Sequence, residues 1–232
     1  MRLSPPQQAL TLSAMAAVVF VIFGAWPGLD LWVSGLFFAS KTGFDGFASG
    51  SWNQLRLAIW RLSEVVLALS ILAYLTQLLV PFPLLRATRH LTGFTALLYL
   101  LGPGLLVDVL LKPLWGRARP AQVTEFGGTL AFTPPHVLSH QCTSNCSFVA
   151  GEVAGAVALA VVLFLVVDRM KGRITLSHRR IAQGVILLVP LFVGVQRIAA
   201  GRHFLSDVLL STIFVLLCAV LLKALILQPR SR

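Results

Sequence analysis

The sequence predicts an all-α membrane protein, a single domain over residues 1–232 built as a bundle of six transmembrane helices. The chain is 57% hydrophobic and only 12% charged, with a mean hydropathy of +0.85. A soluble domain carries about 25% charged residues, so this chain has too little polar surface to cover itself in water. Its apolar residues also gather into six runs, each near the roughly 20 residues that cross a bilayer as a helix.

The six runs are 10–26, 59–80, 91–111, 148–167, 181–196 and 204–227. The first run follows Arg2, as the apolar part of a signal peptide does. It is long for a signal peptide and no small-residue cleavage site follows it, so we expect a membrane helix. Between the first two runs, residues 31–38 predict a short helix lying in the membrane interface. Trp26, Trp32 and Trp52 suit the aromatic belt of such an interface.

Basic residues in two loops and at both termini set the expected orientation. They are Arg2; Arg86, Arg89 and His90; Arg169, Lys171, Arg173, Arg179 and Arg180; and Lys223, Arg230 and Arg232. The positive-inside rule places these segments and both termini in the cytoplasm. This distribution accounts for much of the net charge of +11. No nucleic-acid motif accompanies the charge, so we expect no nucleic-acid partner.

The opposite, periplasmic face carries cations that orientation does not explain. They are Lys112, Arg117, Arg119, Arg197 and Arg202. All five belong to two short segments, KPLWGRARP and RIAAGRHFLSD, at the ends of predicted helices. A functional role accounts for them better than topology does. The long loop 120–147 reaches the same face and is a candidate lid or wall of a substrate path.

The spacing inside these segments favours a phosphate site. Lys112 and Arg119 are seven residues apart and would share one face if the third helix continued to Pro120, with Asp108 pairing to Lys112. His203 and Asp207 are four apart, so on a helix the carboxylate would accept the ring N–H. The simpler interpretations are cations that anchor a helix end at the lipid headgroups and a His–Asp pair that caps the sixth helix.

Together, Lys-x6-Arg-Pro and Arg-x5-His-x3-Asp resemble two signatures of the type 2 phosphatidic acid phosphatase superfamily. The likeness covers about residues 105–210, and six transmembrane helices match the membrane branch of that family. The resemblance implies that three cations, Lys112, Arg119 and Arg197, bind phosphate. It also implies that His203 attacks phosphorus and that Asp207 orients the histidine.

The middle signature departs from the family. Where the family reads Pro-Ser-Gly-His, this chain reads Val149-Ala150-Gly151-Glu152. The serine hydroxyl is missing, but the N–H of Gly151 at a helix start can still donate to an oxyanion. Glu152 replaces the histidine that protonates the leaving group. It is either a general acid, a partner for a cation, or a remnant of weakened catalysis.

The resemblance implies a lipid phosphate phosphohydrolase that forms a phosphohistidine intermediate without metal or other cofactor. Its site would face the periplasm from a bacterial inner membrane. Lipid A, undecaprenyl pyrophosphate, phosphatidylglycerol phosphate and phosphatidic acid are the candidate substrates. The Asn-Cys-Ser-Phe-x-x-Gly-Glu variant most resembles lipid A phosphatases. The alternatives are a lipid phosphotransferase and a non-catalytic lipid-phosphate binder or transporter; the sequence does not address the oligomeric state.

Two weaker features have open interpretations. His136, His140, Cys142 and Cys146 offer soft ligands in one loop but match no strong zinc template. The simpler interpretation is a polar loop, with Cys142 and Cys146 either bridged or free. Arg117 and Arg202 either extend the cationic pocket toward a second phosphate or a sugar, or anchor the chain at the interface.

Overall fold

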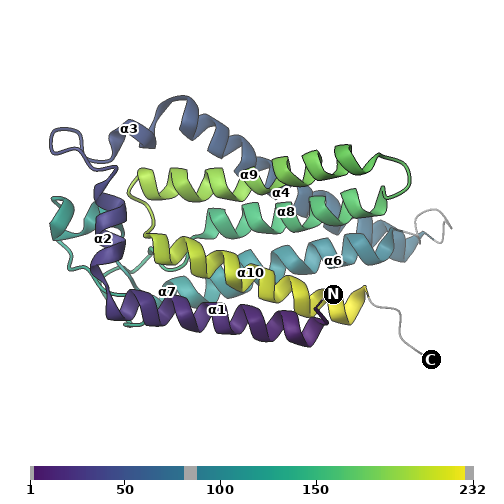
Figure 1. The fold of residues 1–232 in the computed structure, drawn as a ribbon, viewed down its shortest axis with the longest axis horizontal. Coiled ribbons are helices and arrows are strands. Elements are labelled where there is room, and N and C mark those ends of the chain that lie inside the picture. The colour runs from purple at the N-terminus through teal and green to yellow at the C-terminus, as the bar shows by residue number, and fades with distance from the viewer. Residues whose placement is uncertain (1–2, 81–87, 228–232) are drawn as a thin grey trace.

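Six long helical segments lie side by side in the computed structural model, which describes residues 3–80 and 88–227 (Figure 1). They are α1 (Pro5–Ala25), α4 (Gly50–Leu79), the continuous run of α6 (Arg89–Tyr99), η1 (Leu100–Leu111) and α7 (Lys112–Trp115), then α8 (Gly151–Arg169), α9 (Leu176–Ala199) and α10 (Leu205–Ile226). Within the described residues, six helical segments are long and apolar enough to cross a membrane. The predicted all-α transmembrane bundle is confirmed.

Helix α8 lies at the centre of the bundle and packs against α4, α6, η1, α9 and α10. Its inward positions are mostly small, including Ala154, Ala156 and Ala158, and all three are buried. A side chain at Gly155 would begin 3.4 Å from the ring of Trp60 on α4. Small residues allow membrane helices to approach closely. The neighbouring helices therefore pack tightly around α8.

The third spanning segment changes character halfway along. Its first part, α6, is α-helical, whereas η1 has wider π-helical turns and contains Pro103. Proline has no N–H to donate to the preceding turn. The segment still runs without a break to Lys112, so the predicted run 91–111 has the expected extent.

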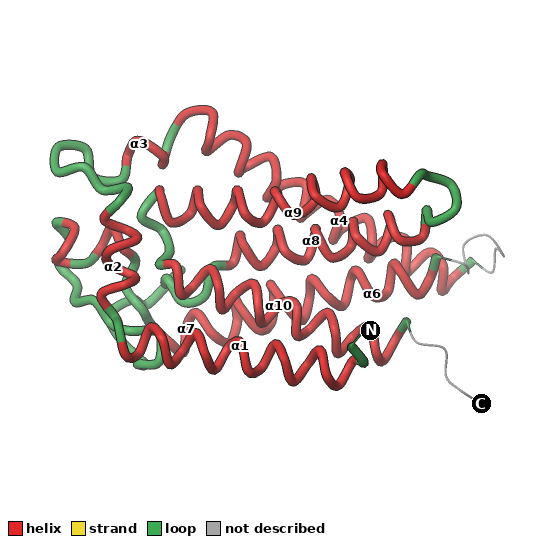
Figure 2. The backbone as a smooth tube through the Cα atoms, viewed as in Figure 1, coloured by secondary structure: helices red, strands yellow, loops and turns green. Residues whose placement is uncertain are grey.

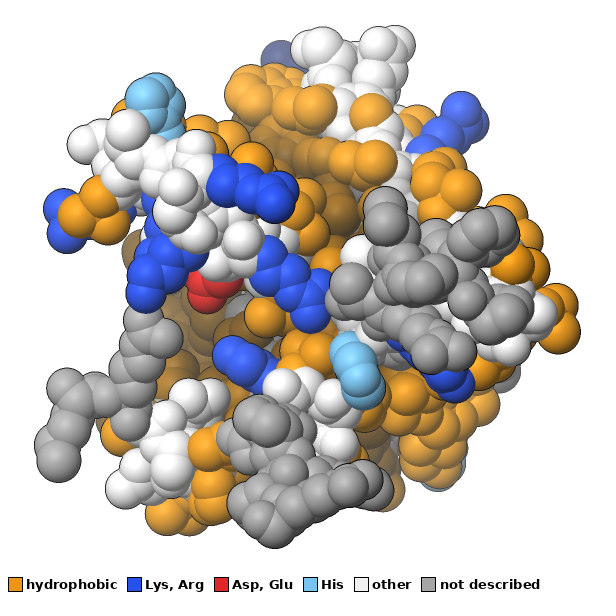
Figure 3. Space-filling model, turned by 90° about the vertical axis from the view of Figure 1, so that its right-hand side faces the viewer, with side chains coloured by type: hydrophobic (Ala, Val, Ile, Leu, Met, Phe, Trp, Pro, Cys, Tyr) orange, Lys and Arg blue, Asp and Glu red, His pale blue; other side chains and the backbone are white. Residues whose placement is uncertain are grey.

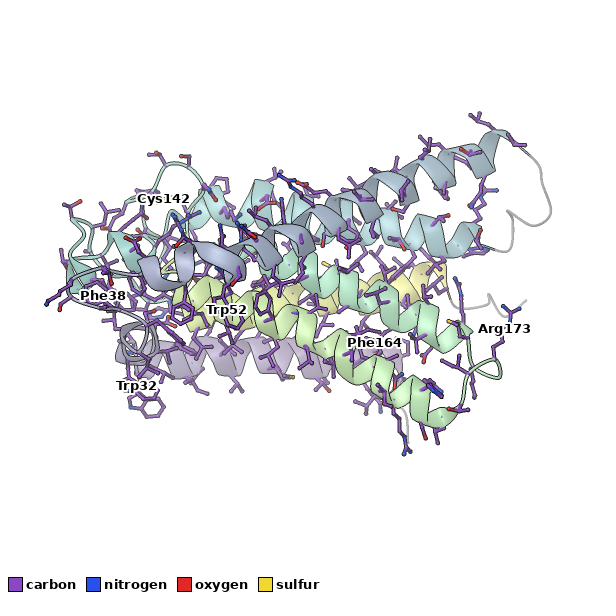
Figure 4. The ribbon with its side chains drawn as sticks, turned by 90° about the horizontal axis from the view of Figure 1, so that it is seen from above. Trp32, Phe38, Trp52, Cys142, Phe164 and Arg173 are labelled. Carbon is purple, nitrogen blue, oxygen red and sulfur yellow. A yellow bond between two sulfur atoms is a disulfide. The ribbon has the colours of Figure 1, made fainter. Side chains whose placement is uncertain are left out.

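One end of the bundle carries the short helices and long loops (Figure 2). Helix α2 (Gly28–Gly35) crosses this end at a steep angle to the bundle (Figure 1), and α3 (Asp45–Ala48), η2 (Pro120–Gln122) and η3 (Thr124–Phe126) lie nearby. The predicted short helix 31–38 therefore exists but both begins and ends three residues earlier, at Gly28 and Gly35. Trp32 on α2 is 63% exposed and points away from the bundle (Figure 4), as an interfacial anchor does.

The other end carries the α8–α9 turn, and the described chain ends lie there as well (Figure 1). Lys and Arg side chains surround that face (Figure 3). Arg173 in the α8–α9 turn and Cys142 in the long loop mark the two opposite ends (Figure 4). Of the basic residues expected there, Arg2, Arg86, Arg230 and Arg232 lie outside the described residues. The bundle thus has one basic end and one end built from loops.

Candidate active site

A polar cavity of about 500 Å³ opens at the loop end of the bundle. Helices α3, α4, α8 and α9, the end of the third spanning segment and three loops contribute to it. The lining residues are Ala48, Asn53, Arg56, Trp60, Asp108, Lys112, Arg119, Asn145, Gly151, Glu152, Arg197, Arg202 and His203. Six of the seven predicted site residues are in this set; Asp207 is the exception.

Lys112 reaches the cavity from the point where η1 becomes α7. Its ammonium forms the predicted ion pair with Asp108, one helical turn earlier. A Cβ atom at Gly151 would lie 2.6 Å from the Lys112 Nζ and 2.8 Å from a carboxylate oxygen of Asp108. A side chain at position 151 would have to displace this ion pair, because the backbone at the start of α8 lies directly against it.

Arg119 reaches the same cavity by a different route from the predicted one. The prediction that Lys112 and Arg119 share a helical face is wrong, because the helix ends at Trp115. Gly116 follows in the left-handed conformation (φ +52°), where a Cβ would lie 2.0 Å from the carbonyl oxygen of Ser139. A left-handed glycine after the last turn is a common helix stop. Arg119 then lies in extended backbone before Pro120.

His203 lies in the loop between α9 and α10, with its side chain buried. Its Nδ1 is 2.7 Å from the carbonyl oxygen of Ser147. A carbonyl only accepts hydrogen bonds, so Nδ1 carries the proton and Nε2 keeps a lone pair. Burial lowers the pKa of His203 well below its usual value, and the charges of Arg119 and Lys112 lower it further. The lowered pKa favours the neutral imidazole at physiological pH.

Asp207 does not accept the ring N–H of His203, so the predicted direct pair is wrong. The helical spacing rule fails because α10 begins at Leu205, after the histidine. The Asp207 carboxylate instead accepts hydrogen bonds from the Ser147 hydroxyl (2.6 Å) and the Phe204 backbone N–H (2.9 Å). Ser147 therefore links the two residues: its hydroxyl donates to Asp207 and its carbonyl accepts from His203.

Arg117 is neither part of the cavity nor an interface anchor, which corrects both predicted alternatives. Its side chain is fully buried and pairs with Asp30 at 2.8 Å and with Asp207 at 2.6 Å. Ser206 also accepts a hydrogen bond from it, and its guanidinium lies 4.4 Å from the ring centre of Phe204. Burial raises the pKa of Asp30, and the Arg117 charge opposes that rise. Arg117 thus ties α2 to the start of α10, behind the cavity.

Arg202, for which the sequence predicts the same two alternatives as for Arg117, is exposed at the cavity edge. It follows Gly201, which has φ +64° and whose Cβ position would lie 2.4 Å from the ring of Phe44. The chain therefore turns sharply between Arg197 and His203. That turn places Arg202 and His203 in one cavity.

Glu152 joins two cations across the cavity. Its carboxylate accepts from Arg197 at 3.2 Å and from Arg56 at 2.8 Å. Arg197 is held further by the side-chain oxygen of Gln196 (2.7 Å), and Arg56 by that of Asn53 (2.8 and 3.1 Å). This arrangement matches the predicted alternative in which Glu152 is a partner for a cation. The role of general acid stays a prediction.

Sequence reasoning missed Arg56 and Asp30, both important at this end of the bundle. Arg56 lies in the first turns of α4, and Asp30 in the first turn of α2. For Asp30 the available signal was a lone charged residue in a mostly apolar stretch, since such charges near membranes are costly unless paired. The polar sequence around Arg56 gave no comparable signal. Their partners, Glu152 and Arg117, are 96 and 87 residues away in the chain.

A disulfide joins Cys142 and Cys146 near the end of the long loop. Both sulfurs are engaged, so of the two alternatives the bridged one is found, and the loop does not offer four free soft ligands. Asn145, within the bridged segment, has φ +50° and lines the cavity. Ser147 follows the bridge directly and carries the contacts to His203 and Asp207.

The cavity is suited to binding an anion that carries more than one charge. Arg56, Lys112, Arg119, Arg197 and Arg202 face it, against the carboxylates of Asp108 and Glu152. Guanidinium forks match the oxygens of a phosphate. His203 lines the same cavity, and its Nε2 is not the nitrogen that contacts Ser147.

The sequence is similar to that of known proteins along most of its length. The sequence profile of the PAP2 superfamily matches residues 92–230. A lipid A 4'-phosphatase of Francisella tularensis subsp. novicida is 30% identical over 228 residues, which cover 95% of each chain. A lipid A 4'-phosphatase of Rhizobium etli is 33% identical over 222 residues, covering 89% of this chain and 82% of the relative.

The fold is also similar to a solved structure. The transmembrane PAP2-type phosphatidylglycerolphosphate phosphatase of Bacillus subtilis superposes with a TM-score of 0.62 over 97% of this chain and 99% of that one. The two sequences are 19% identical. This likeness therefore concerns the arrangement of the helices.

Proposed function

The chain belongs to the PAP2 superfamily of phosphatases, and we propose that it removes a phosphate group from lipid A through attack by His203. One observation carries the proposal. A buried, neutral imidazole shares a cavity with Lys112, Arg119 and Arg197, at one end of a membrane-spanning bundle. A lipid phosphate has its headgroup at that depth and its chains beside the helices.

The proposed reaction has two steps. Nε2 of His203 attacks phosphorus, the N–P bond forms, and the P–O bond to the sugar breaks to release an alkoxide that takes up a proton. Water then attacks the phosphohistidine, the N–P bond breaks, and phosphate leaves. The cations stabilise charge on the phosphoryl oxygens in both steps, which is the main task in phosphoryl transfer.

Asp207 acts in this proposal as a positioning residue. It holds the Ser147 hydroxyl, and the carbonyl of the same residue fixes the proton of His203 on Nδ1. Glu152 orients Arg56 and Arg197 toward the cavity. The backbone N–H of Gly151 at the start of α8 remains available to a phosphate oxygen.

We place the site at the periplasmic face of a bacterial inner membrane. Two observations at opposite ends of the bundle support this orientation. The loop end carries the Cys142–Cys146 disulfide, and such bonds persist in oxidising compartments. The other end carries the basic loops, including Arg169, Lys171 and Arg173, as cytoplasmic ends do (Figure 3).

Lipid A is favoured over the other candidate substrates by the relatives, which resemble this chain along nearly its whole length. The cavity supports the choice as well. Beside the three predicted phosphate ligands it presents Arg56, Arg202 and Asn145, which suit the hydroxyl and amide groups of a phosphorylated sugar. A simple glycerol phosphate has fewer groups for these side chains.

The test is phosphate release by the purified protein in detergent micelles. The substrates are lipid A, undecaprenyl pyrophosphate, phosphatidylglycerol phosphate and phosphatidic acid. We expect lipid A to be hydrolysed fastest, and His203→Ala to reduce its rate by at least about 10³-fold because the nucleophile is lost. Trapping of acid-labile phosphate on wild type, and not on His203→Ala, would identify the phosphohistidine.

His140→Ala is the matched control, since this histidine is exposed on the long loop and does not line the cavity. It should retain the wild-type rate. Full activity of His203→Ala would exclude the mechanism, and transfer of the labelled phosphate to a second lipid instead of water would identify a phosphotransferase. Binding without release of any phosphate would identify a lipid-phosphate binder.

A further inference from the structure

An apolar groove lies beside the cavity, where α3 and the first turns of α4 contact α9. It has a volume of about 120 Å³ and is lined by Phe47, Trp52, Phe192, Val195, Gln196 and Ala199. The rings of Trp52 and Phe192 stack with their centres 5.9 Å apart. Trp52 is 53% exposed and Val195 is 47% exposed, so the groove is open on the side of the bundle that faces the bilayer.

The groove and the cavity are lined by neighbouring residues at three places. At each place one residue lines the groove and the next residue in the chain lines the cavity. These pairs are Phe47 and Ala48, Trp52 and Asn53, and Gln196 and Arg197. A molecule with a charged head in the cavity therefore has an apolar surface immediately beside it.

Gln196 forms hydrogen bonds on both sides, to a residue of the groove and to a residue of the cavity. Its amide nitrogen donates to the backbone oxygen of Phe47 at 2.7 Å, which ties α9 to α3. Its amide oxygen accepts from Nε of Arg197 at 2.7 Å, which aims a phosphate-binding guanidinium. The side chain is buried, so both bonds are shielded from water. A ligand in the groove thus contacts the residue that positions Arg197.

We infer that this groove binds one acyl chain of the lipid whose phosphate occupies the cavity. The inference rests on the proposed function and adds how the substrate is aligned. A packed helix has a diameter of about 10 Å, so a groove of about 120 Å³ is too small for a second copy of this chain and suits part of a single hydrocarbon chain. Alignment of the chain fixes the phosphate relative to His203, which is a gain in proximity and orientation.

The decisive variant is Val195→Trp, which fills the groove without removing any packing. Its kcat/KM is measured on lipid A and on the fully deacylated disaccharide bisphosphate, which has the same headgroup. We expect the value for lipid A to fall about tenfold, because the chain loses its dispersion contacts and its alignment. We expect the value for the deacylated substrate to change less than about twofold, because its reaction does not involve the groove.

Leu187→Trp is the matched control, since Leu187 is an exposed residue two turns earlier on α9 and does not line the groove. It should leave kcat/KM unchanged for both substrates. A second variant, Trp52→Ala, opens the groove by removing one stacked ring, and we expect it to lower the lipid A value alone. Trp32→Ala controls for the general loss of an interfacial tryptophan, because Trp32 points away from the bundle.

The possible results separate this inference from the proposed function. If wild type hydrolyses lipid A but Val195→Trp affects both substrates equally or neither, the groove does not hold an acyl chain and the phosphatase proposal stands. If wild type hydrolyses neither lipid A nor the deacylated bisphosphate, both proposals fail. Selective loss on lipid A with Val195→Trp and Trp52→Ala, and not with the two controls, establishes the groove as a substrate site.

Discussion

Arg117 and Arg119 are two residues apart and belong to two different ion networks at the same end of the bundle. Arg117 lies behind the cavity with Asp30 and Asp207, and the side chains of all three are fully buried. Arg119 lies at the open cavity with Lys112 and Arg197, where cations outnumber carboxylates. In the first network every charged group has a partner inside the protein, whereas the second has cationic capacity left for a ligand.

The difference shows how a membrane protein separates stability from binding within a few residues. A buried charge is tolerated only when it is paired and hydrogen-bonded, and breaking such a network leaves an uncompensated charge. An open group of cations is tolerated because water solvates it, and it binds an anion when one arrives. Removal of Arg117 should therefore affect folding, and removal of Arg119 should affect catalysis.

The largest effect on stability is expected from Arg117→Ala. It leaves the carboxylates of Asp30 and Asp207 buried without their cation, which costs about 3–5 kcal/mol in the free energy of unfolding. Thermal unfolding in detergent, followed by circular dichroism, measures the loss. If Arg117→Ala unfolds at the wild-type temperature, the buried network does not stabilise the fold.

Arg119→Ala should have the opposite profile. Loss of one phosphate-binding cation lowers kcat/KM by about 10²–10³-fold, the usual cost of removing one group that stabilises transition-state charge. The free energy of unfolding should change by less than about 1 kcal/mol, because the side chain reaches water. Steady-state kinetics measures the change in kcat/KM, and thermal unfolding of the same preparation measures the change in stability. A large loss of stability would show that Arg119 has a structural role like that of Arg117.

Glu152→Gln tests whether a carboxylate at the edge of the open network supports the cations or donates a proton. If Glu152 only pairs with Arg56 and Arg197, its loss affects all substrates alike. We then expect kcat to fall by less than about tenfold, both for lipid A and for an aryl phosphate. A general acid contributes about 10²–10⁴-fold and matters mainly for a poor leaving group. A large loss confined to lipid A would therefore assign the acid role.

The smallest effect concerns the pH profile. Burial and the charges of Arg119 and Lys112 lower the pKa of His203, and the neutral imidazole is the active form. Activity should therefore persist as the pH falls through 6.5, the ordinary value for histidine, and decline only at lower pH. In Arg119→Ala the acid limb should move to higher pH, because one of the charges that oppose protonation is gone. An acid limb at or above 6.5 in wild type would contradict the neutral buried histidine.

The sequence could predict the spans, a short helix after the first span, and six of the seven residues it proposed for one site, in that these six line a single cavity. The reason is that each depends on local information: apolar runs long enough to cross a bilayer, and charged residues where those runs end. The errors come from the positions where helices end and begin, and from contacts between distant segments. Asp207 was assigned to His203 from a spacing of four, but the start of α10 at Leu205 gives its carboxylate to Ser147 and Arg117.

Apolar runs of spanning length and charges at their ends are enough to indicate a membrane-spanning helical protein with cations and a histidine at one end, because bilayer thickness and helical rise leave few other solutions. Which of those cations line the cavity depends on how the helices pack. The buried position of Arg117, the pairing of Arg56 with Glu152 and the groove beside Arg197 arise where α2, α4 and α9 converge. Such contacts depend on packing between segments tens of residues apart. The spacing of residues within one segment therefore does not predict them.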